Sequence, residues 1–326
     1  MRIFIAGATG VVGRHLVSEL ISAGHSVIGL TRTTAKTEAL VRLGAEAVVA
    51  DALDAWAVER AVASAKPDVV LHELTDIGAA ADYRHFDRAF ARTNELRTRG
   101  TDHLLAAARK AGVQRFIAQS FCGWPFARDG EKVKSEADEL DPDPPHELHR
   151  SLAALRYLEH CVSSSPDVEG IVLRYGYFYG HDTGMLSPSM QEEIRQRRVP
   201  LIGDGDGWWS FLHVEDAAAA TALAIERGKT GNVYNIVDDE PAPAREWLPA
   251  LAQMLGAKPP FHVPAFIARF LAGEHLVMMM TQARAGSNAK AKRELGWQPA
   301  HPSWRQGFAE TIQAPLAPVA SLAEES

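Results

Sequence analysis

The stretch that decides the fold is Gly7-Ala8-Thr9-Gly10-Val11-Val12-Gly13, near the start of a chain of 326 residues. It follows an apolar run at residues 2–6, typical of a strand, and opens a segment with helical periodicity at residues 13–23. Glycines in this context allow a tight turn, close approach of the backbone to a pyrophosphate and close packing of the helix on the sheet. The unpaired N–H groups of the helix start attract phosphate. We predict a dinucleotide-binding loop; the alternative is a tight turn without a ligand.

Further cofactor contacts are expected where the next strands end. An NAD-binding protein usually carries an acidic residue about 20 positions beyond the glycines, but here Thr31 is followed by Arg32. A guanidinium can make a forked contact with a 2′-phosphate, which favours NADP(H), whereas the alternative is a solvated arginine. Asp51 can accept a hydrogen bond from the adenine amino group or cap the next helix. The predicted cofactor-binding residues are Gly7, Thr9, Gly10, Val11, Val12, Gly13, Arg32, Asp51, Ala52 and Leu74.

Apolar runs alternate with helical segments over the first 120 residues. This alternation predicts parallel βαβ units, and Val69-Val70-Leu71 is typical of a strand covered on both faces. The expected strands are residues 2–6, 26–30, 47–50, 69–72, 115–118, 170–175 and 232–236. The expected helices are residues 13–23, 34–43, 56–65, 93–111, 151–162, 189–197 and 217–226.

Composition excludes several classes of protein. The chain has 46% hydrophobic and 23% charged residues, which is ordinary for a globular protein, and its net charge of −7 gives no basic field for nucleic acid or anionic lipid. No apolar run is long enough to cross a membrane, and Ile3-Phe4-Ile5-Ala6 is too short for the core of a signal peptide. Cys122 and Cys161 form no disulfide framework, so we interpret them as buried, inert thiols of a cytoplasmic protein. No motif with metal-ligand spacing occurs, and no metal site is predicted.

These features together resemble the extended short-chain dehydrogenase/reductase superfamily, the group related to NAD(P)-dependent epimerases and dehydratases. The resemblance runs from Met1 to about Ile312, with landmarks that include Leu173-Arg174-Tyr175-Gly176-Tyr177, Phe211-Leu212-His213-Val214-Glu215-Asp216 and Glu294-Leu295-Gly296-Trp297. It implies an α/β fold with a Rossmann-type, doubly wound parallel sheet at residues 1–180, completed by about residues 210–240, and a smaller, mostly helical substrate domain at residues 181–209 and 241–313. We expect a disordered tail at residues 314–326, and a homodimer through the helices at 93–111 and 151–162.

The family's chemistry implies a Tyr and a Lys four residues apart on one helix face, with a Ser at the end of the preceding strand. Ser120 matches that serine to within one position. Aligning Glu159 with the acidic residue usual after the Lys puts Ser151 at the Tyr position and Leu155 at the Lys position. No Tyr-x-x-x-Lys pair occurs anywhere in the chain. The helix is kept while its proton-transfer pair is missing.

This departure leaves three hypotheses open. In the first, an NADP(H)-dependent oxidoreductase moves a hydride between nicotinamide and a carbonyl or alcohol carbon, Ser120 orients the oxygen, and Tyr177 or water supplies the proton. Ser151, His149 and Glu73 are lesser proton donors, and the alternative for Tyr177 is aromatic packing under the nicotinamide. In the second hypothesis the chain is a non-redox lyase or isomerase, including one that acts on a nucleotide sugar. In the third it is a catalytically silent NADP(H) sensor that binds a partner protein.

Aromatic and sulfur-containing side chains favour a small hydrophobic or ring-bearing substrate. Trp208 and Trp209 follow a glycine-rich turn and could form an aromatic wall, or else anchor the loop in the core. The apolar run at residues 261–280 could line an adaptable pocket or pack as ordinary helices. A nucleotide sugar would need basic residues for its pyrophosphate, and the candidates are Arg195, Arg197, Arg198 and Arg284.

Overall fold

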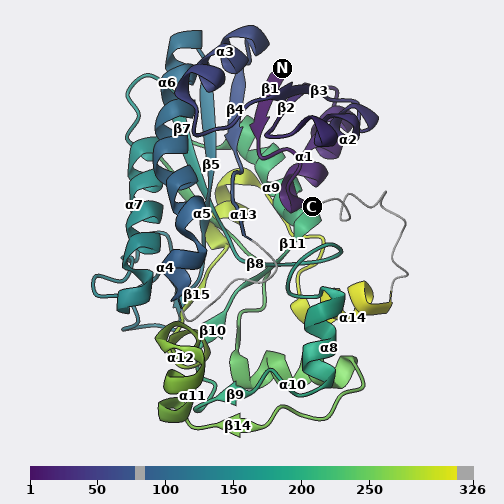
Figure 1. Ribbon diagram of the computed structural model, residues 1–326, viewed down its shortest axis with the longest axis vertical. Coiled ribbons are helices and arrows are strands. Elements are labelled where there is room, and N and C mark those ends of the chain that lie inside the picture. Colours follow the sequence, from purple (N-terminus) through teal and green to yellow (C-terminus); the bar gives the residue numbers. More distant parts are fainter. Residues whose placement is uncertain (78–84, 314–326) are drawn as a thin grey trace.

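A seven-stranded parallel sheet forms the centre of the computed structural model, which describes residues 1–77 and 85–313 (Figure 1). The strand order is β12-β7-β5-β4-β1-β2-β3. Because β1 lies inside the sheet, the chain winds first to one side of it and then to the other, which confirms the predicted doubly wound Rossmann-type fold. The strands are β1 (Arg2–Ala6), β2 (Ser26–Thr31), β3 (Glu46–Val49), β4 (Val69–His72), β5 (Arg115–Phe121), β7 (Glu169–Tyr175) and β12 (Val233–Ile236).

Helices cover both faces of this sheet. On one face α1 packs against α9, and on the other α3 packs against α6 beside α7 (Figure 1). Strand β1 shows why: Ile3 and Ile5 enter one apolar core, Phe4 and Ala6 enter the other, and all four are fully buried. The helices are α1 (Val11–Ser22), α2 (Thr37–Arg42), α3 (Ala55–Ala65), α4 (Phe86–Ala89), α5 (Ala91–Glu95), α6 (Thr101–Ala111), α7 (His149–Ser163) and α9 (Val214–Arg227).

The helix predicted at residues 93–111 is present, but it is not α-helical throughout, because a π-helical turn at Leu96–Gly100 joins α5 to α6. The wider turn changes how the backbone carbonyls are used. Nε2 of the buried His72 lies 3.2 Å from the Leu96 carbonyl and 3.1 Å from the Thr101 hydroxyl. Burial lowers the pKa of His72 to about 4, so the ring is neutral. His72 on β4 therefore provides a hydrogen-bond partner for the polar groups inside the π-helical turn.

Apart from α13 (Ala289–Leu295), which packs against α9 and the edge strand β12, the remaining elements pack below the carboxyl edge of the sheet. Four short strand pairs, which the sequence patterns do not predict, brace this region: β8 (Tyr177–Tyr179) with β11 (Phe211–His213), β9 (Leu201–Ile202) with β14 (His262–Val263), β10 (Trp208–Trp209) with β13 (Ala242–Pro243), and β6 (Val133–Lys134) with β15 (Ala285–Gly286). Its helices are α8 (Pro188–Arg195), α10 (Ala244–Met254), α11 (Ala265–Ala272), α12 (Glu274–Thr281) and α14 (Trp304–Gln313). The expected disordered tail lies outside the described residues.

The two cysteines have different surroundings. Cys122 is fully buried, and burial raises the pKa of its thiol far above the ordinary value, so it is unreactive as predicted. Cys161 on α7 is only partly buried, which corrects the prediction for that residue. Among the described helices, none is long and apolar enough to span a bilayer.

Candidate active site

The glycine loop between β1 and α1 has a different steric reason for each glycine. Gly7 has φ +102°, and a Cβ there would lie 2.5 Å from the Glu73 carbonyl oxygen. A Cβ on Gly13 would lie 2.2 Å from the Gly7 carbonyl oxygen, so α1 could not pack as closely. Gly10 is exposed, and its nearest obstacle is the Gly7 oxygen at 3.2 Å. Gly7 and Gly13 therefore shape the turn, while Gly10 leaves open space beside the backbone.

The amino end of α1 is suited to a phosphate group. Gly10 is its N-cap, no side chain caps it, and no acidic residue lies in its first turn. Val11 and Thr9 are partly exposed at this end, whereas Val12 is 5% exposed and packs in the core. Backbone N–H groups of a helix start that lack a cap bind phosphate well. The residues present therefore fit a dinucleotide pyrophosphate.

Charged side chains line the carboxyl ends of β2, β3 and β4. Arg32 contacts Asp76, with 3.2 Å between Nη1 and Oδ2, and Arg92 on α5 donates to Asp51 Oδ2 at 2.7 Å. Burial acts against the charge on Asp51, but the Leu53 N–H and the Arg92 guanidinium outweigh it and hold the pKa of this carboxyl below its ordinary value. The Asp51 carboxylate is therefore ionised and half-exposed beside Arg32.

One alternative for Asp51 is wrong, because the residue that caps α3 is Asp54, which accepts from the N–H groups of Trp56 and Ala57. The neighbouring residues of the predicted cofactor set lie at the same edge. Ala52 is buried, and its carbonyl oxygen lies 3.0 Å from Nδ1 of His103. Leu74 is partly buried, and its N–H donates to Nδ1 of His72. These two residues contribute a rigid apolar border.

Glu73 lies directly beneath the glycine loop. Its carboxyl group is 5% exposed, and the Tyr175 hydroxyl donates to Oε1 at 3.3 Å, whereas Oε2 has no hydrogen-bond partner. Burial raises the pKa of Glu73 to about 8, although the Tyr175 hydrogen bond works in the opposite direction. Glu73 is therefore a neutral acid at neutral pH. It lies in the interior and presents no surface to a substrate.

Ser120 does not face the carboxyl edge. Its side chain is buried at the end of β5 and donates to Glu159 Oε1 at 2.6 Å. Glu159 in turn receives two hydrogen bonds from Arg174, at 2.7 and 2.6 Å. Since side chains alternate along a strand, the neighbour Phe121 points to the opposite side and contacts Tyr177. The Ser120 hydroxyl is thus engaged by Glu159, and its predicted role in orienting a substrate oxygen stays a prediction.

The positions of the missing Tyr and Lys on α7 are closed to solvent. Ser151 has no exposed surface, and its hydroxyl donates to Asp87 Oδ1 at 2.6 Å and accepts from Asn94 Nδ2 at 3.0 Å. Asp87 also accepts the backbone N–H groups of Arg150 and Ser151, which makes it the cap of α7. Leu155, one turn further, is 1% exposed and packs in the lower core. Neither position offers an acid or a base.

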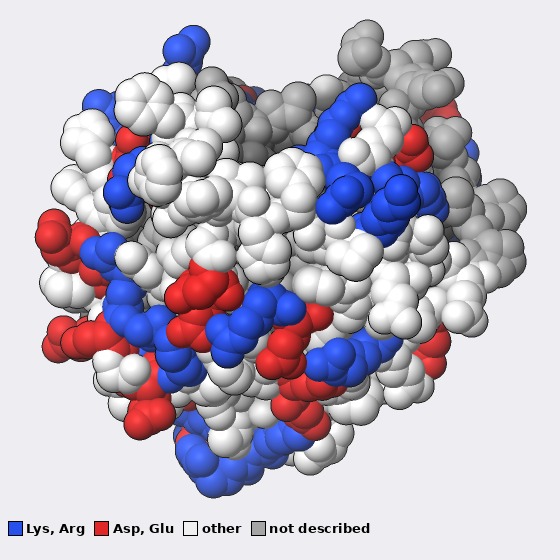
Figure 2. Space-filling model, turned by 90° about the horizontal axis from the view of Figure 1, so that it is seen from below, with Lys and Arg blue, Asp and Glu red and all other residues white. Residues whose placement is uncertain are grey.

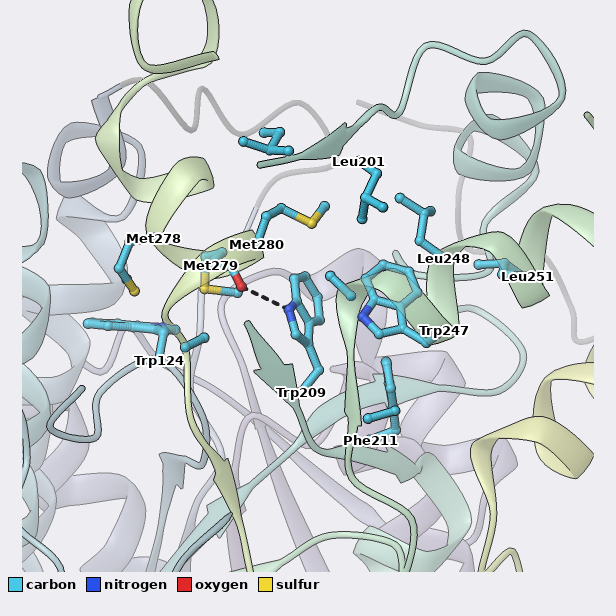
Figure 3. Close-up of a cluster of buried hydrophobic side chains, with 14 of the residues drawn as sticks. Trp124, Leu201, Trp209, Phe211, Trp247, Leu248, Leu251, Met278, Met279 and Met280 are labelled. Carbon is cyan, nitrogen blue, oxygen red and sulfur yellow. Dashed lines mark hydrogen bonds between the residues drawn. The ribbon is translucent and has the colours of Figure 1, made fainter. Parts of the chain in front are cut away.

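Tyr177 on β8 is partly exposed within an aromatic cluster. Its ring stacks on Trp209 at a centroid distance of 4.2 Å, and its hydroxyl donates to Met279 Sδ at 3.2 Å. The Trp209 indole N–H donates to the Met279 carbonyl (Figure 3). Trp209 also packs against Trp247, and it is 7% exposed. Trp209 and the ring of Tyr177 therefore have the alternative role, which is aromatic packing. The Tyr177 hydroxyl stays a candidate proton donor.

The apolar run at residues 261–280 divides into two parts. Val277, Met278, Met279 and Met280 on α12 are buried in the cluster shown in Figure 3. Phe266, Ile267, Phe270 and Leu271 on α11 are exposed instead, with Phe270 93% exposed. The large apolar side chains of this run that reach the interior therefore come from α12, whereas α11 contributes the small Ala268.

The arginines proposed for a nucleotide sugar do not gather. Arg195 pairs with Glu192, Arg198 pairs with Glu193, and Arg197 lies over the ring of Phe261. Arg284 is buried, and it donates to the carbonyl groups of Gln282 and Arg128. On the face seen from below, acidic and basic side chains are interspersed (Figure 2). No second pyrophosphate site is formed by these residues.

Two side chains of the site have no motif of their own, Asp87 and Asn94, and each is recognisable only from a partner that is distant in sequence. Glu159 served only as an alignment landmark, and its contacts with Ser120 and Arg174 were not predicted. His149, a lesser candidate, is exposed, with Nε2 2.8 Å from the Pro144 carbonyl. The outer surface of α6 and α7, the predicted dimer interface, includes Tyr157, whose hydroxyl donates to Asp102. The homodimer stays a prediction.

One group within the described ranges 1–77 and 85–313 has ligand atoms close enough for a metal: His213, Asp216 and His301, within 4.8 Å of one another. The Asp216 carboxylate already accepts the backbone N–H groups of Ala300 and His301, and His301 Nδ1 lies 3.1 Å from it. These contacts fasten the segment before α14 to α9, which is a structural role.

Comparison with known proteins identifies the class of protein that this fold and glycine loop define. Residues 3–237 match the model of the NAD dependent epimerase/dehydratase family, and the chain belongs to that family. The chain shares 43% identity over 310 residues with the 3-diazoavenalumate denitrifying reductase of a Streptomyces species, covering 94% of this chain and 99% of the relative. It shares 30% identity with a 4-hydroxy-2-methyl-3-oxo-4-farnesyl-3,4-dihydroquinoline-1-oxide ketoreductase of Stigmatella aurantiaca, covering 91% and 92%.

The fold also has close neighbours among solved structures. The UDP-glucose 4-epimerase of Thermotoga maritima, crystallised with UDP-glucose, superposes with a TM-score of 0.75 at 23% identity, covering 96% of this chain and 97% of that one. That likeness shows the fold alone. The family and the two reductases together establish the chain as an enzyme, an NAD(P)-dependent oxidoreductase.

Proposed function

We propose that this enzyme is an NADP(H)-dependent reductase of a small, ring-bearing substrate, and that it replaces an aromatic diazonium group by hydride at the ring carbon. The observation that carries the proposal is the closed surface of α7, where Ser151 and Leu155 replace the proton-transfer pair. The relative named as a denitrifying reductase of a diazo compound supports the same chemistry.

Proton balance distinguishes the possible reactions. Reduction of a ketone to an alcohol adds a hydride to carbon and a proton to oxygen, so the enzyme must supply an acid. Replacement of the diazonium group by hydride forms a C–H bond, breaks the C–N bond and releases N2, with no net proton taken up. An active site without the Tyr and Lys can therefore replace a diazonium group by hydride. It lacks the usual general acid for reduction of a ketone.

Different residues of the chain would bind different parts of the cofactor and the substrate. Gly10 and the amino end of α1 would hold the pyrophosphate, Asp51 the adenine amino group, and Arg32 the 2′-phosphate. When bound, the nicotinamide supplies the hydride. Tyr177 and Phe121, whose rings meet edge to face at 5.0 Å, would border an aromatic substrate, and aromatic rings stack favourably on such groups.

A second function, reduction of a carbonyl group, is favoured by one observation. Tyr177 is partly exposed beside the aromatic cluster, and its hydroxyl, which donates to Met279 Sδ, is an acid of the right type to protonate a substrate oxygen. The relative from Stigmatella aurantiaca is named as a ketoreductase. In that reaction Tyr177 would supply the proton that α7 no longer provides.

The test uses oxidation of NADPH, followed by absorbance at 340 nm, with a diazotised aminobenzoate and a panel of aromatic ketones. We expect NADPH oxidation and N2 release in equal amounts with the diazonium probe, beyond the uncatalysed reaction of the mixed reagents. Gly10→Val, which fills the open space beside the loop, is the control and should abolish the enzymatic part. Tyr177→Phe should leave this rate unchanged.

Other outcomes point to other functions. Turnover of ketones alone, lost in Tyr177→Phe, would replace the diazo proposal by carbonyl reduction. Product formation without net oxidation of NADPH would indicate a lyase or isomerase. Tight binding of NADPH with no turnover of any substrate would indicate a sensor. Preference for NADH in the same assay would contradict the cofactor assignment of Arg32.

A further inference from the structure

Two arginines converge on a single carboxylate oxygen at the carboxyl edge of the sheet. Arg32 Nη1 lies 3.2 Å from Asp76 Oδ2, and Arg92 Nε lies 3.5 Å from the same atom. Two guanidinium groups directed at one anionic oxygen form the arrangement that a phosphate monoester requires.

Arg92 is held in place for such a contact. Its Nη2 donates to Asp51 at 2.7 Å, which fixes the guanidinium plane. Its Nε is buried and makes no hydrogen bond, although Asp76 Oδ2 lies 3.5 Å away. A buried donor without a partner is costly in a folded protein. A phosphate oxygen nearer than Asp76 would satisfy it.

The position of the Arg32–Asp76 pair also points to the cofactor. Arg32 follows β2 and Asp76 follows β4, and β1 lies between these two strands in the sheet. The glycine loop leaves the end of β1, so the ion pair spans the edge beside the loop. A dinucleotide extended from the loop toward Arg32 would meet the Asp76 carboxylate.

The Asp76 carboxylate can move away from the two arginines with little loss of stability. Arg32 and Asp76 are 50% and 36% exposed, and exposed ion pairs contribute little to stability. The backbone of Asp76 is fixed separately, because its N–H donates to the buried hydroxyl of Thr93 at 3.0 Å. The carboxylate can therefore turn away while the backbone stays beside Arg92.

We propose that Arg32 and Arg92 together form the binding site for the 2′-phosphate, and that Asp76 occupies this site until a phosphate monoester displaces it. The inference rests on the proposed use of NADP(H) and deepens it. Arg92 becomes a second specificity-determining residue for the phosphorylated cofactor, and Asp76 becomes its internal competitor.

The test is calorimetric titration of the whole protein with NADPH, NADH, 2′,5′-ADP and 5′-ADP. The readout is the ratio of affinities with and without the 2′-phosphate, so that a general effect on adenosine binding cancels. Arg92→Gln should lower this ratio about tenfold or more, as expected for a hydrogen bond to a charged group. Asp76→Asn should raise it about threefold, because only a weak exposed ion pair is removed.

Arg109→Gln is the matched control, since Arg109 pairs with Asp167 on another surface, and its ratio should equal that of the wild type. An unchanged ratio in Arg92→Gln, or a lower ratio in Asp76→Asn, would overturn the inference. A wild-type protein that binds NADH more tightly than NADPH would instead contradict the proposed cofactor. Even if the wild type prefers NADH, a higher ratio in Asp76→Asn would support the proposal that Arg32 and Arg92 bind a phosphate together. An unchanged ratio would overturn that proposal too.

Discussion

The glycine loop after β1 and the first turns of α7 border the same edge of the central sheet, yet they differ in how far a ligand can approach them. The loop keeps open space at Gly10 and an amino helix end without a side-chain cap. On α7 the two reactive positions are filled by Ser151, bound to Asp87, and by Leu155, packed in the core. The comparison shows that a ligand can approach the glycine loop of this enzyme, whereas the two α7 positions are closed to one. Such an enzyme suits a reduction that needs hydride alone.

The largest expected effect comes from restoring a charge on α7. Leu155→Lys should lower the free energy of unfolding by about 4 kcal/mol, because Leu155 is 1% exposed and an ammonium group there would lose its hydration. Urea denaturation measures the loss, and Leu155→Met, which conserves volume, should cost less than about 1.5 kcal/mol. A Lys variant as stable as the wild type would mean that this face of α7 opens to solvent.

At the glycine loop, Gly13→Ala should cost about 3 kcal/mol and prevent nucleotide binding, because the added Cβ would lie 2.2 Å from the Gly7 oxygen. Thermal unfolding and NADPH titration check both effects. Gly184→Ala is the control, since nothing lies within 4 Å of a Cβ at that position. Normal binding by Gly13→Ala would show that α1 can shift away from the sheet.

Between the two regions lies Glu73, which should make stability depend on pH. Burial raises its pKa to about 8 in the folded protein, so folding favours the protonated acid. This contribution is fully present below the unfolded pKa, declines as the pH rises and is lost above about pH 8. Stability of the wild type relative to Glu73→Gln should therefore fall by about 1.4 kcal/mol from pH 6 to pH 7. Urea titrations at these two pH values measure it, and parallel behaviour of the two proteins would refute the assignment.

The smallest effect is expected for Ser151→Ala. Loss of the hydroxyl contacts with Asp87 and Asn94 should cost about 1 kcal/mol, as for other buried hydrogen bonds. The kcat of diazonium reduction should stay within about twofold, a change well below that caused by loss of a general acid. Steady-state kinetics decides between the roles: a loss of a hundredfold or more would make Ser151 a catalytic residue after all.

Much of the fold could be predicted from the sequence because its signals are local. The apolar run of β1, the spacing of Gly7, Gly10 and Gly13, and the periodicity of the helices depend on neighbouring residues only. The π-turn at Leu96–Gly100 could not be predicted, because it depends on His72 reaching across from β4. The short strand pairs could not be predicted either, since two-residue strands carry almost no pattern.

The candidate site likewise has features with a local sequence signal and features that depend on tertiary contacts. The sequence by itself determined the nucleotide loop, the position of Arg32 and the absence of a Tyr and Lys pair on α7. Only the tertiary structure decided that Ser120 serves the Glu159–Arg174 ion pair, that Asp87 caps α7, and that Arg92 joins Arg32 at Asp76. The physical reason is that a backbone loop is built from adjacent residues, whereas the partner of a buried or shared charge comes from whichever element the fold brings beside it.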